Sequence, residues 1–377
     1  MAVRLQQQLE QAIAEARDEG AAACLRAQLA ILRARMGHAE EAWRELDELR
    51  QMQARELRPT LAAWLALARA VVGYYGHRNE LSCQPLLRAQ ALATTARVRP
   101  VQALASAWLA HMHYVGQRTE PMVRAIVQVL QEAAPDHHAA RSRVSLVIAQ
   151  NYHYAGRLES AQQWYRRAHE HAAAEGDVAT LAALMHNRAW IDVCLARLTL
   201  LYGTECGPKM IASLRQTMLS AESMLHLNAH MHYGTDDGLV QMLKAVLLVL
   251  TEQPAEALVL FRRYLDAAIG NGMQQNASTL MAERGWCHWQ LGDAATARAD
   301  AEAALATLRT DEHADDEEAA ATLAWVARLH EAQGHAEAAR ALRAEGRRRY
   351  ETCRSHWLQT FEHLERELAH FAQAELA

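Results

Sequence analysis

Several residue types that shape other folds are scarce in this chain of 377 residues. There are seven prolines and three phenylalanines, and lysine occurs only as Lys209 and Lys244. No stretch alternates convincingly between apolar and polar residues with a period of two, which is the pattern of a half-buried strand. The abundant residues are instead alanine, leucine, arginine, glutamate and glutamine, all strong helix formers. An all-α fold with essentially no sheet is therefore expected.

The charge balance does not favour a polyanionic partner. The formal net charge is −5 and the isoelectric point is near 6.5, so the chain has no general basic field. One local arginine patch, within residues 340–349, is typical of a solvated helix face. We therefore predict no nucleic-acid partner.

Cysteine usage and apolar runs bear on the compartment. The six cysteines are scattered and form no CxxC pair, which favours reduced, mostly buried thiols over a disulfide framework. The N-terminus has no apolar stretch of signal-peptide length. The longest apolar runs, 61–68 and 245–250, fall far short of the roughly 20 residues that a membrane span needs. We expect a cytoplasmic protein without a membrane partner, and the Ala/Arg bias is typical of a high-GC bacterial genome.

Catalytic signatures are missing as well. Neither lysine follows a glycine, so the chain has no phosphate-binding GKS or GKT loop, and no GxSxG nucleophile motif occurs. No pattern assembles a nucleophile, a base and an orienting group. We therefore predict that the protein is not an enzyme and needs no cofactor.

Histidine is plentiful, with 20 residues, and leaves one metal-binding alternative open. His226 and His230 are four residues apart and share a helix face, so they could hold one metal ion if a third ligand joins them. Glu222 and His186 are the candidates for that ligand.

The most informative pattern is a repeat. Tyr74-Tyr75-Gly76, Tyr114-Val115-Gly116 and Tyr154-Ala155-Gly156 place tyrosine and glycine at a fixed spacing of 40 residues. Each glycine ends an apolar helical stretch. A fixed period of this size indicates a helical solenoid, in which one helix pair is repeated and stacked.

The clearest unit, residues 143–172, carries small residues at Ala149, Ala161 and Ala168 and large ones at Tyr152 and Tyr165. This order, with the glycine turn between, resembles the tetratricopeptide repeat (TPR). Similar turns are expected at positions 37, 76, 116, 156, 203, 253, 292 and 334. Their spacing exceeds the usual period of about 34 residues, so the repeats look like the expanded TPRs of bacterial regulators.

These patterns lead to a specific architecture. We predict a right-handed superhelix of about eight TPR-like helical hairpins over residues 1–345, followed by a C-terminal helix over residues 346–377. Trp357, Phe361, Leu364, Leu368 and Phe371 form an a/d apolar stripe there. The stripe predicts a capping helix over the last repeat, or alternatively a homodimer contact.

The TPR resemblance implies the function class, which is non-enzymatic recognition of a protein or peptide in bacterial signalling or regulation. A ligand-responsive sensor module is the alternative. In that family the first helix of each pair lines an inner groove, where the partner binds. The candidate groove residues are Tyr74, His113, Tyr114, Gln150, His153, Tyr154, Asn187, Trp286, Trp289 and Arg328. The opposing interpretation places the tyrosines between repeats, as part of the core.

Overall fold

The structure is a computed structural model that describes residues 4–76, 83–203, 214–221, 223, 237–270, 272–310 and 314–376. Within these ranges the chain forms helices joined by turns and contains no strand, which confirms the all-α prediction. The elements are α1 (Arg4–Glu15), α2 (Glu19–Arg35), α3 (Ala39–Arg55), α4 (Pro59–Tyr75), α5 (Gln84–Thr95), α6 (Arg99–Val115), α7 (Thr119–Glu132), α8 (His138–Tyr154), α9 (Leu158–Glu175), α10 (Val178–Tyr202), α12 (Asp237–Leu250), α13 (Pro254–Gly270), η1 (Gln274–Asn276), α14 (Ala277–Gln290), α15 (Ala294–Thr310), α16 (Asp316–Ala332) and α17 (Ala336–Leu376).

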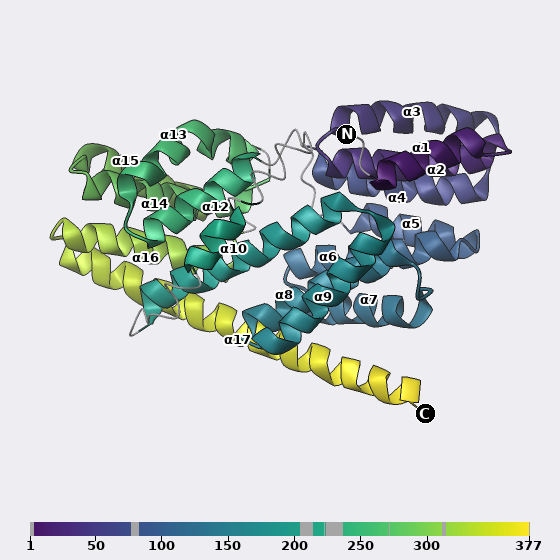
Figure 1. Ribbon diagram of the computed structural model, residues 1–377. Coiled ribbons are helices and arrows are strands. Elements are labelled where there is room, and N and C mark those ends of the chain that lie inside the picture. The colour runs from purple at the N-terminus through teal and green to yellow at the C-terminus, as the bar shows by residue number, and fades with distance from the viewer. Residues whose placement is uncertain are drawn as a thin grey trace. The chain divides into compact units, whose positions relative to one another are not determined.

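Consecutive helices pack as hairpins, and the first helices of successive hairpins pack on one another. Figure 1 shows this for α2, which lies between its hairpin partner α3 and the next first helix, α4. All eight predicted turn positions fall within three residues of the end of a first helix: α2, α4, α6, α8, α10, α12, α14 or α16. The predicted helical-hairpin solenoid is confirmed.

Six of the eight predicted turns contain a left-handed residue among the described positions. Gly156 adopts φ 73°, a conformation that glycine enters without steric cost, and the turn glycines at 37, 292 and 334 do the same. Two turns reach this conformation without glycine, at Gln117 and Glu252. The turn without glycine that the sequence shows near residue 253 is therefore a variant of the same geometry.

Small residues let the helices of a hairpin approach closely, as the sequence predicts. Ala149, Ala161 and Ala168 are at most 2% exposed. The Ser142 hydroxyl donates a hydrogen bond of 2.8 Å to the Ala168 carbonyl across the α8–α9 hairpin, which needs the two backbones to be close.

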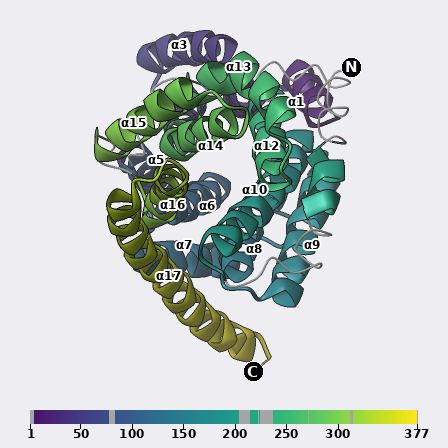
Figure 2. The same cartoon turned by 90° about the vertical axis from the view of Figure 1, so that its left-hand side faces the viewer.

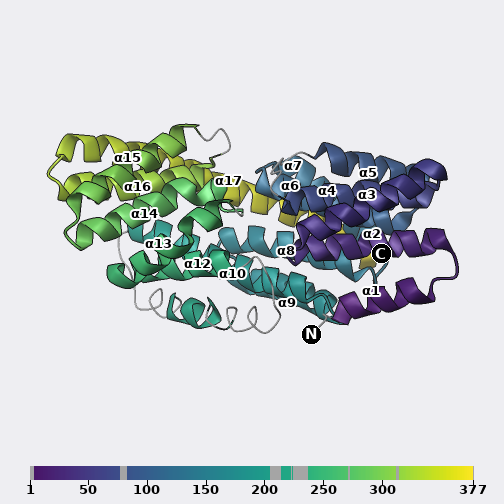
Figure 3. The ribbon, with the colours of Figure 1, turned by 90° about the horizontal axis from the view of Figure 1, so that it is seen from above.

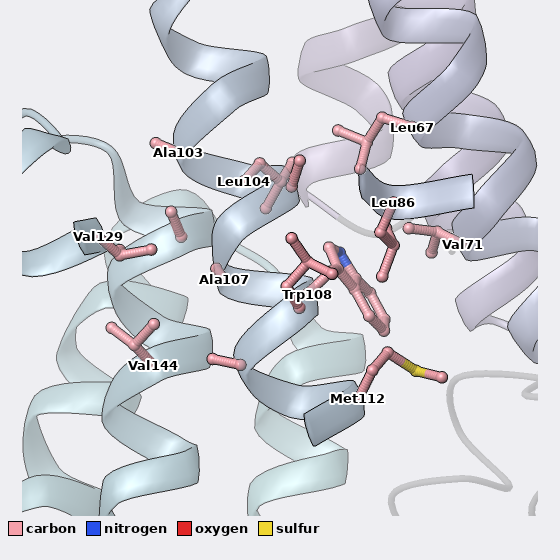
Figure 4. Packing of buried hydrophobic residues seen from close by; sticks show 14 of the residues in the cluster. Leu67, Val71, Leu86, Ala103, Leu104, Ala107, Trp108, Met112, Val129 and Val144 are labelled. Carbon is pink, nitrogen blue, oxygen red and sulfur yellow. The ribbon is translucent and has the colours of Figure 1, made fainter. Parts of the chain in front are cut away.

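The chain divides into two compact units, which are described separately. Unit 1 comprises the described residues of Met1–Leu184 and Gln359–Ala377, and unit 2 those from Met185 to Leu358. In unit 2, the consecutive helices α12 and α13 lie together in Figure 2, and the successive first helices α14 and α16 lie side by side in Figure 3. The core of unit 1 is centred on α4, α6 and α8 and includes Trp108, which is 2% exposed (Figure 4).

The C-terminal helix begins earlier than expected. α17 runs from Ala336 to Leu376 without a break, so residue 346 is not an element boundary. The apolar stripe is largely buried: Phe361 and Leu364 belong to the core of unit 1, and Leu368 packs against it. The Phe371 side chain lies outside the described residues.

The end of α17 contacts α7 and α8 within unit 1. Thr360 and Thr119 are joined by a hydroxyl hydrogen bond of 2.6 Å, and the ring of Phe361 meets Tyr152 edge-on at 5.1 Å. This part of the helix covers apolar surface of its own chain, but that surface belongs to α7 and α8 and not to the last repeat, where the stripe was predicted to form a cap. A homodimer through the same stripe stays a prediction.

Candidate functional site

Unit 1 curls until its first hairpin meets the turn between α9 and α10. The Arg35 guanidinium, at the end of α2, donates hydrogen bonds of 2.7 and 3.2 Å to the two carboxylate oxygens of Asp177. The Leu5 N–H donates to the Gly176 carbonyl at 3.4 Å. These contacts join residues about 140 or more positions apart, so the first helices α2, α4, α6 and α8 line a curved inner side.

Five side chains gather on these first helices, and we call them the inner cluster: Tyr74 and Tyr75 on α4, Trp108 and His111 on α6, and Arg143 on α8. The Arg143 guanidinium carbon lies 3.5 Å from the Trp108 ring centroid. Both tyrosine rings meet Trp108 edge-on, at 5.8 and 5.9 Å. The Tyr74 hydroxyl is 3.0 Å from His111 Nε2. The face of Trp108 therefore covers one cation, and three further aromatic rings pack edge-on against Trp108.

Burial sets the protonation states of the inner cluster. It lowers the pKa of His111 to about 3, with help from the Arg143 charge, so the imidazole is neutral at physiological pH. It also raises the pKa of the Tyr74 phenol, which keeps its proton. Burial lowers the pKa of Arg143, but a guanidinium starts so high that it remains charged. Arg143 is thus the only charged group of the inner cluster.

Arg143 has no acidic partner among the residues that the structure describes: it forms no ion pair and no hydrogen bond with any of them. Arg35, close enough for its charge to act on Arg143, is matched by Asp177. A partly buried guanidinium without an acceptor retains its unused N–H donors. It can therefore bind a carboxylate by donating two parallel hydrogen bonds, the geometry that arginine favours.

A pocket of about 120 Å³ adjoins the inner cluster. It is lined by Trp43, Arg69, Ala70, Val71, Gly73, Tyr74, Pro85, Leu86, Trp108 and Met112. In Figure 4 the Trp108 indole points toward Val71, Leu86 and Met112. Tyr74 and Trp108 belong to both the pocket and the inner cluster. The volume suits one apolar side chain, since drug-sized ligands occupy roughly 300–1,000 Å³.

Unit 2 repeats the arginine–tryptophan arrangement. The Arg328 guanidinium on α16 lies 4.3 Å from the Trp286 ring centroid on α14 and 5.4 Å from that of Trp325. Within the described part of the chain, Arg328 also forms no ion pair. In both units an arginine of one first helix covers a tryptophan of the preceding first helix.

The structure distributes the predicted groove residues over several environments. Tyr74 joins the inner cluster, and Trp286 meets Arg328. His113 instead lies near Cys83, with Nδ1 3.8 Å from the thiol sulfur, and burial together with Arg118 lowers its pKa to about 4. Tyr114 packs against the core of unit 1, as the core interpretation of the tyrosines predicts. Trp289 packs against the core of unit 2.

The α8 candidates differ from the expected stripe. His153 is 3% exposed and its Nδ1 lies 3.3 Å from the Tyr165 hydroxyl, inside the α8–α9 hairpin, so it does not face a groove. Gln150 is 5% exposed, and its Oε1 atom is buried without a hydrogen-bond donor from the part of the chain that the structure describes. Tyr154 and Asn187 are partly exposed. Adjacent helix positions point about 100° apart, so His-Tyr pairs cannot form one continuous surface.

Sequence reasoning missed Tyr75, Trp108, His111 and Arg143. The available signal was a tryptophan on one first helix and an arginine on the next, which is visible at Trp108 and Arg143 and again at Trp286 and Arg328. The turn pattern drew attention to helix ends instead, whereas both arginines lie at least six residues before their turns.

The metal alternative rests on His226, His230 and Glu222, which lie outside the described residues. Among the residues described, no three potential ligands come together to hold a metal ion. His186 is on α10, where burial lowers its pKa to about 4 and its ring stacks on Trp190 at 6.2 Å. None of the helices that the structure describes is both long and apolar enough to cross a membrane.

Comparison with known proteins establishes the fold but no family. No family model matches the chain, and no curated protein does. Among solved structures, the Rap protein complexed with competence and sporulation factor matches with a TM-score of 0.56 and 11% identity, covering 93% of this chain and 92% of that one. This chain is similar in fold to the Rap protein. The IFIT1 monomeric mutant with Gppp-AAAA gives a TM-score of 0.39 at 13% identity, covering 91% of this chain and 94% of that one. Membership of the TPR family stays a prediction, while the helical repeats themselves are established.

Proposed function

We propose that the protein is a non-enzymatic scaffold that recognises a protein or peptide partner on the inner faces of its first helices. Its setting would be a signalling or regulatory system in the bacterial cytoplasm. The observation that carries the proposal is the pair of arginines, Arg143 and Arg328, each stacked on tryptophan and each without an acidic partner among the described residues.

The chemistry of these two places suits polypeptide recognition. Tryptophan and arginine are enriched among the residues that dominate binding energy at protein interfaces. A guanidinium that stacks on an indole keeps its N–H donors available. It also loses little further conformational freedom on binding, so its hydrogen bonds to a carboxylate or carbonyl form at low entropic cost. The Rap protein, which shares the fold, is known complexed with a factor, and we infer that this chain likewise holds a partner.

The sensor alternative requires a pocket that encloses a whole small ligand. The pocket beside Trp108, at about 120 Å³, has room for a side chain rather than for a metabolite of ordinary size. This observation favours a partner that inserts one residue and continues along the surface, as a peptide does.

The proposal is tested by capture on the immobilised full chain from an extract of the source organism. Retained proteins and peptides would be identified by mass spectrometry, and each would then be titrated in pure form by calorimetry. We expect a partner with defined stoichiometry whose affinity falls in the Arg143→Gln/Arg328→Gln double variant. The failure of every captured polypeptide to bind saturably in pure form would refute the scaffold function.

A further inference from the structure

We propose that the inner cluster of unit 1 is a carboxylate-binding site for a peptide, with Arg143 as the anchor and the pocket beside Trp108 as the receptor for a neighbouring apolar side chain. This inference rests on the proposed scaffold function and names the chemistry that its partner must present.

The first step is the unused capacity of Arg143. Its guanidinium lies 3.5 Å from the Trp108 ring centroid and forms no hydrogen bond or ion pair with any described residue. Removing a charge from water without a counterion is costly, and a proper acceptor recovers much of that cost. The nearby Arg35 has such an acceptor, because it donates hydrogen bonds to both carboxylate oxygens of Asp177.

The second step is the local charge. Arg35 and Asp177 neutralise each other, and burial together with the Asp177 charge raises the pKa of Glu175 to about 7, so this carboxyl is substantially protonated at neutral pH. Among the residues that the structure describes, Arg143 therefore leaves a positive excess on the inner side of unit 1. A ligand with one negative charge would balance it.

The third step is access. Tyr75, whose ring packs against Trp108, is 40% exposed, and Arg143 itself is partly exposed, so a ligand can reach one edge of the inner cluster from solvent. Tyr74 and Trp108 also line the pocket, which places apolar wall next to the cation. A single ligand with a carboxylate and an adjacent apolar side chain can use both features.

A carboxylate fits better than a phosphate. One guanidinium matches a single carboxylate through two parallel hydrogen bonds. Phosphate sites recruit several donors, commonly backbone N–H groups at a helix N-terminus. In contrast, Arg143 lies within the second turn of α8 and packs on the neutral Trp108 ring, and the nearby Arg35 is already paired with Asp177.

The test uses synthetic pentapeptide pools of three kinds with the full-length chain. The first pool has a free C-terminal carboxylate but no Asp or Glu, the second is amidated and contains Asp and Glu, and the third is amidated without acidic residues. Bound peptides are separated by size-exclusion chromatography, identified by mass spectrometry and titrated individually by calorimetry. The first two pools distinguish a terminal from a side-chain carboxylate.

We expect retention from the first or second pool and none from the third. Arg143→Gln should weaken binding of the selected peptides at least about tenfold, since a charge-assisted pair is lost. Arg143→Lys should also weaken it, because lysine keeps the charge but loses the planar fork. The matched control is Arg167→Gln, which removes an exposed arginine lying 4.5 Å above Trp164 on α9 and should leave affinity unchanged.

The results separate this inference from the scaffold function. Equal retention from the third pool would refute the carboxylate site and leave a peptide-binding scaffold. So would unchanged peptide affinities in the Arg143→Gln variant, provided that its circular dichroism spectrum is unchanged. No retention from any pool would also refute the carboxylate site, and the extract experiment would then decide the scaffold function on its own.

Discussion

Buried charges in this protein differ in what balances them. In unit 2, Arg197 Nε lies 2.9 Å from Glu283 Oε1, and both side chains are at most 1% exposed. Burial disfavours the charged form of each side chain, whereas the opposite charge of the partner favours the charged form. The two charges of this pair therefore balance each other, whereas Arg143 has no opposite charge paired with it among the described residues.

The Arg197–Glu283 pair gives a prediction for stability. Glu283→Ala leaves a buried guanidinium without its counterion and should lower the free energy of unfolding by about 3–5 kcal/mol. The double variant Arg197→Met/Glu283→Leu removes both charges and should regain most of that loss. Urea unfolding followed by circular dichroism measures both, and a double variant no more stable than Glu283→Ala would contradict the charge argument.

Glu318 gives a pH dependence. It is 4% exposed and accepts hydrogen bonds from the Thr279 N–H at 2.8 Å and the Ser278 hydroxyl at 3.1 Å. Burial raises its pKa from 4.5 to about 7, an effect that Arg197 partly offsets. The folded state therefore binds this proton more tightly than the unfolded state, so the contribution of Glu318 to stability falls as pH rises from about 4.5 to 7 and is constant above.

The comparison of wild type with Glu318→Gln isolates that contribution. Relative to the variant, wild-type unfolding free energy should fall by up to about 3 kcal/mol between about pH 5 and pH 8, at roughly 1.4 kcal/mol per pKa unit. Denaturant unfolding of both proteins across this range measures the difference. Parallel curves would show that Glu318 does not hold its proton in the folded state.

At the scale of elements, the turns were predictable because their signals are local. A left-handed glycine after an apolar helix depends only on neighbouring residues, and Gly156 meets that requirement. The continuity of α17 was not predicted, because the sequence analysis placed the end of the last repeat at residue 345 and a separate C-terminal helix after it. Gly346 instead lies within α17, where a Cβ would fall 2.3 Å from the Tyr202 hydroxyl and 3.2 Å from Leu323 Cβ.

Gly346 is therefore a packing residue, which can be tested. Gly346→Ala should destabilise the protein by about 1–3 kcal/mol, because the added methyl displaces Tyr202 from its 2.6 Å hydrogen bond to the Ala320 carbonyl. Gly73→Ala is the control: its Cβ would meet nothing closer than 3.9 Å, and alanine in a helix should stabilise by about 0.5–1 kcal/mol. Thermal unfolding of both variants would show opposite shifts, and a stabilising Gly346→Ala would contradict the packing role.

At the scale of the whole molecule, the last residues of the chain complete a core built by residues far earlier in the sequence. Phe361 is 5% exposed and lies between Tyr152, at 5.1 Å, and the Arg157 guanidinium, at 5.2 Å. The a/d spacing predicted an apolar stripe here, but spacing alone does not say which surface covers it.

Phe361→Ala should therefore lower the free energy of unfolding by about 3–5 kcal/mol. Leu358→Ala, one turn earlier and 39% exposed, should change it by at most about 0.5 kcal/mol. Denaturant unfolding gives both values, and light scattering after size exclusion gives the mass of each variant. Wild-type dimers that dissociate in Phe361→Ala without loss of monomer stability would assign the stripe to an interface instead.

The sequence by itself determined the all-α class, the hairpin repeat and the eight turn positions, because helix propensity, apolar periodicity and turn glycines act over a few residues. It could not determine which side chains of different repeats meet. The stacking of Arg143 on Trp108 and the pairing of Arg35 with Asp177 depend on small rotations between hairpins that accumulate along a solenoid. Only the tertiary structure, in which these rotations are summed and unit 1 curls upon itself, decided where an unpaired charge, an aromatic face and a pocket come together.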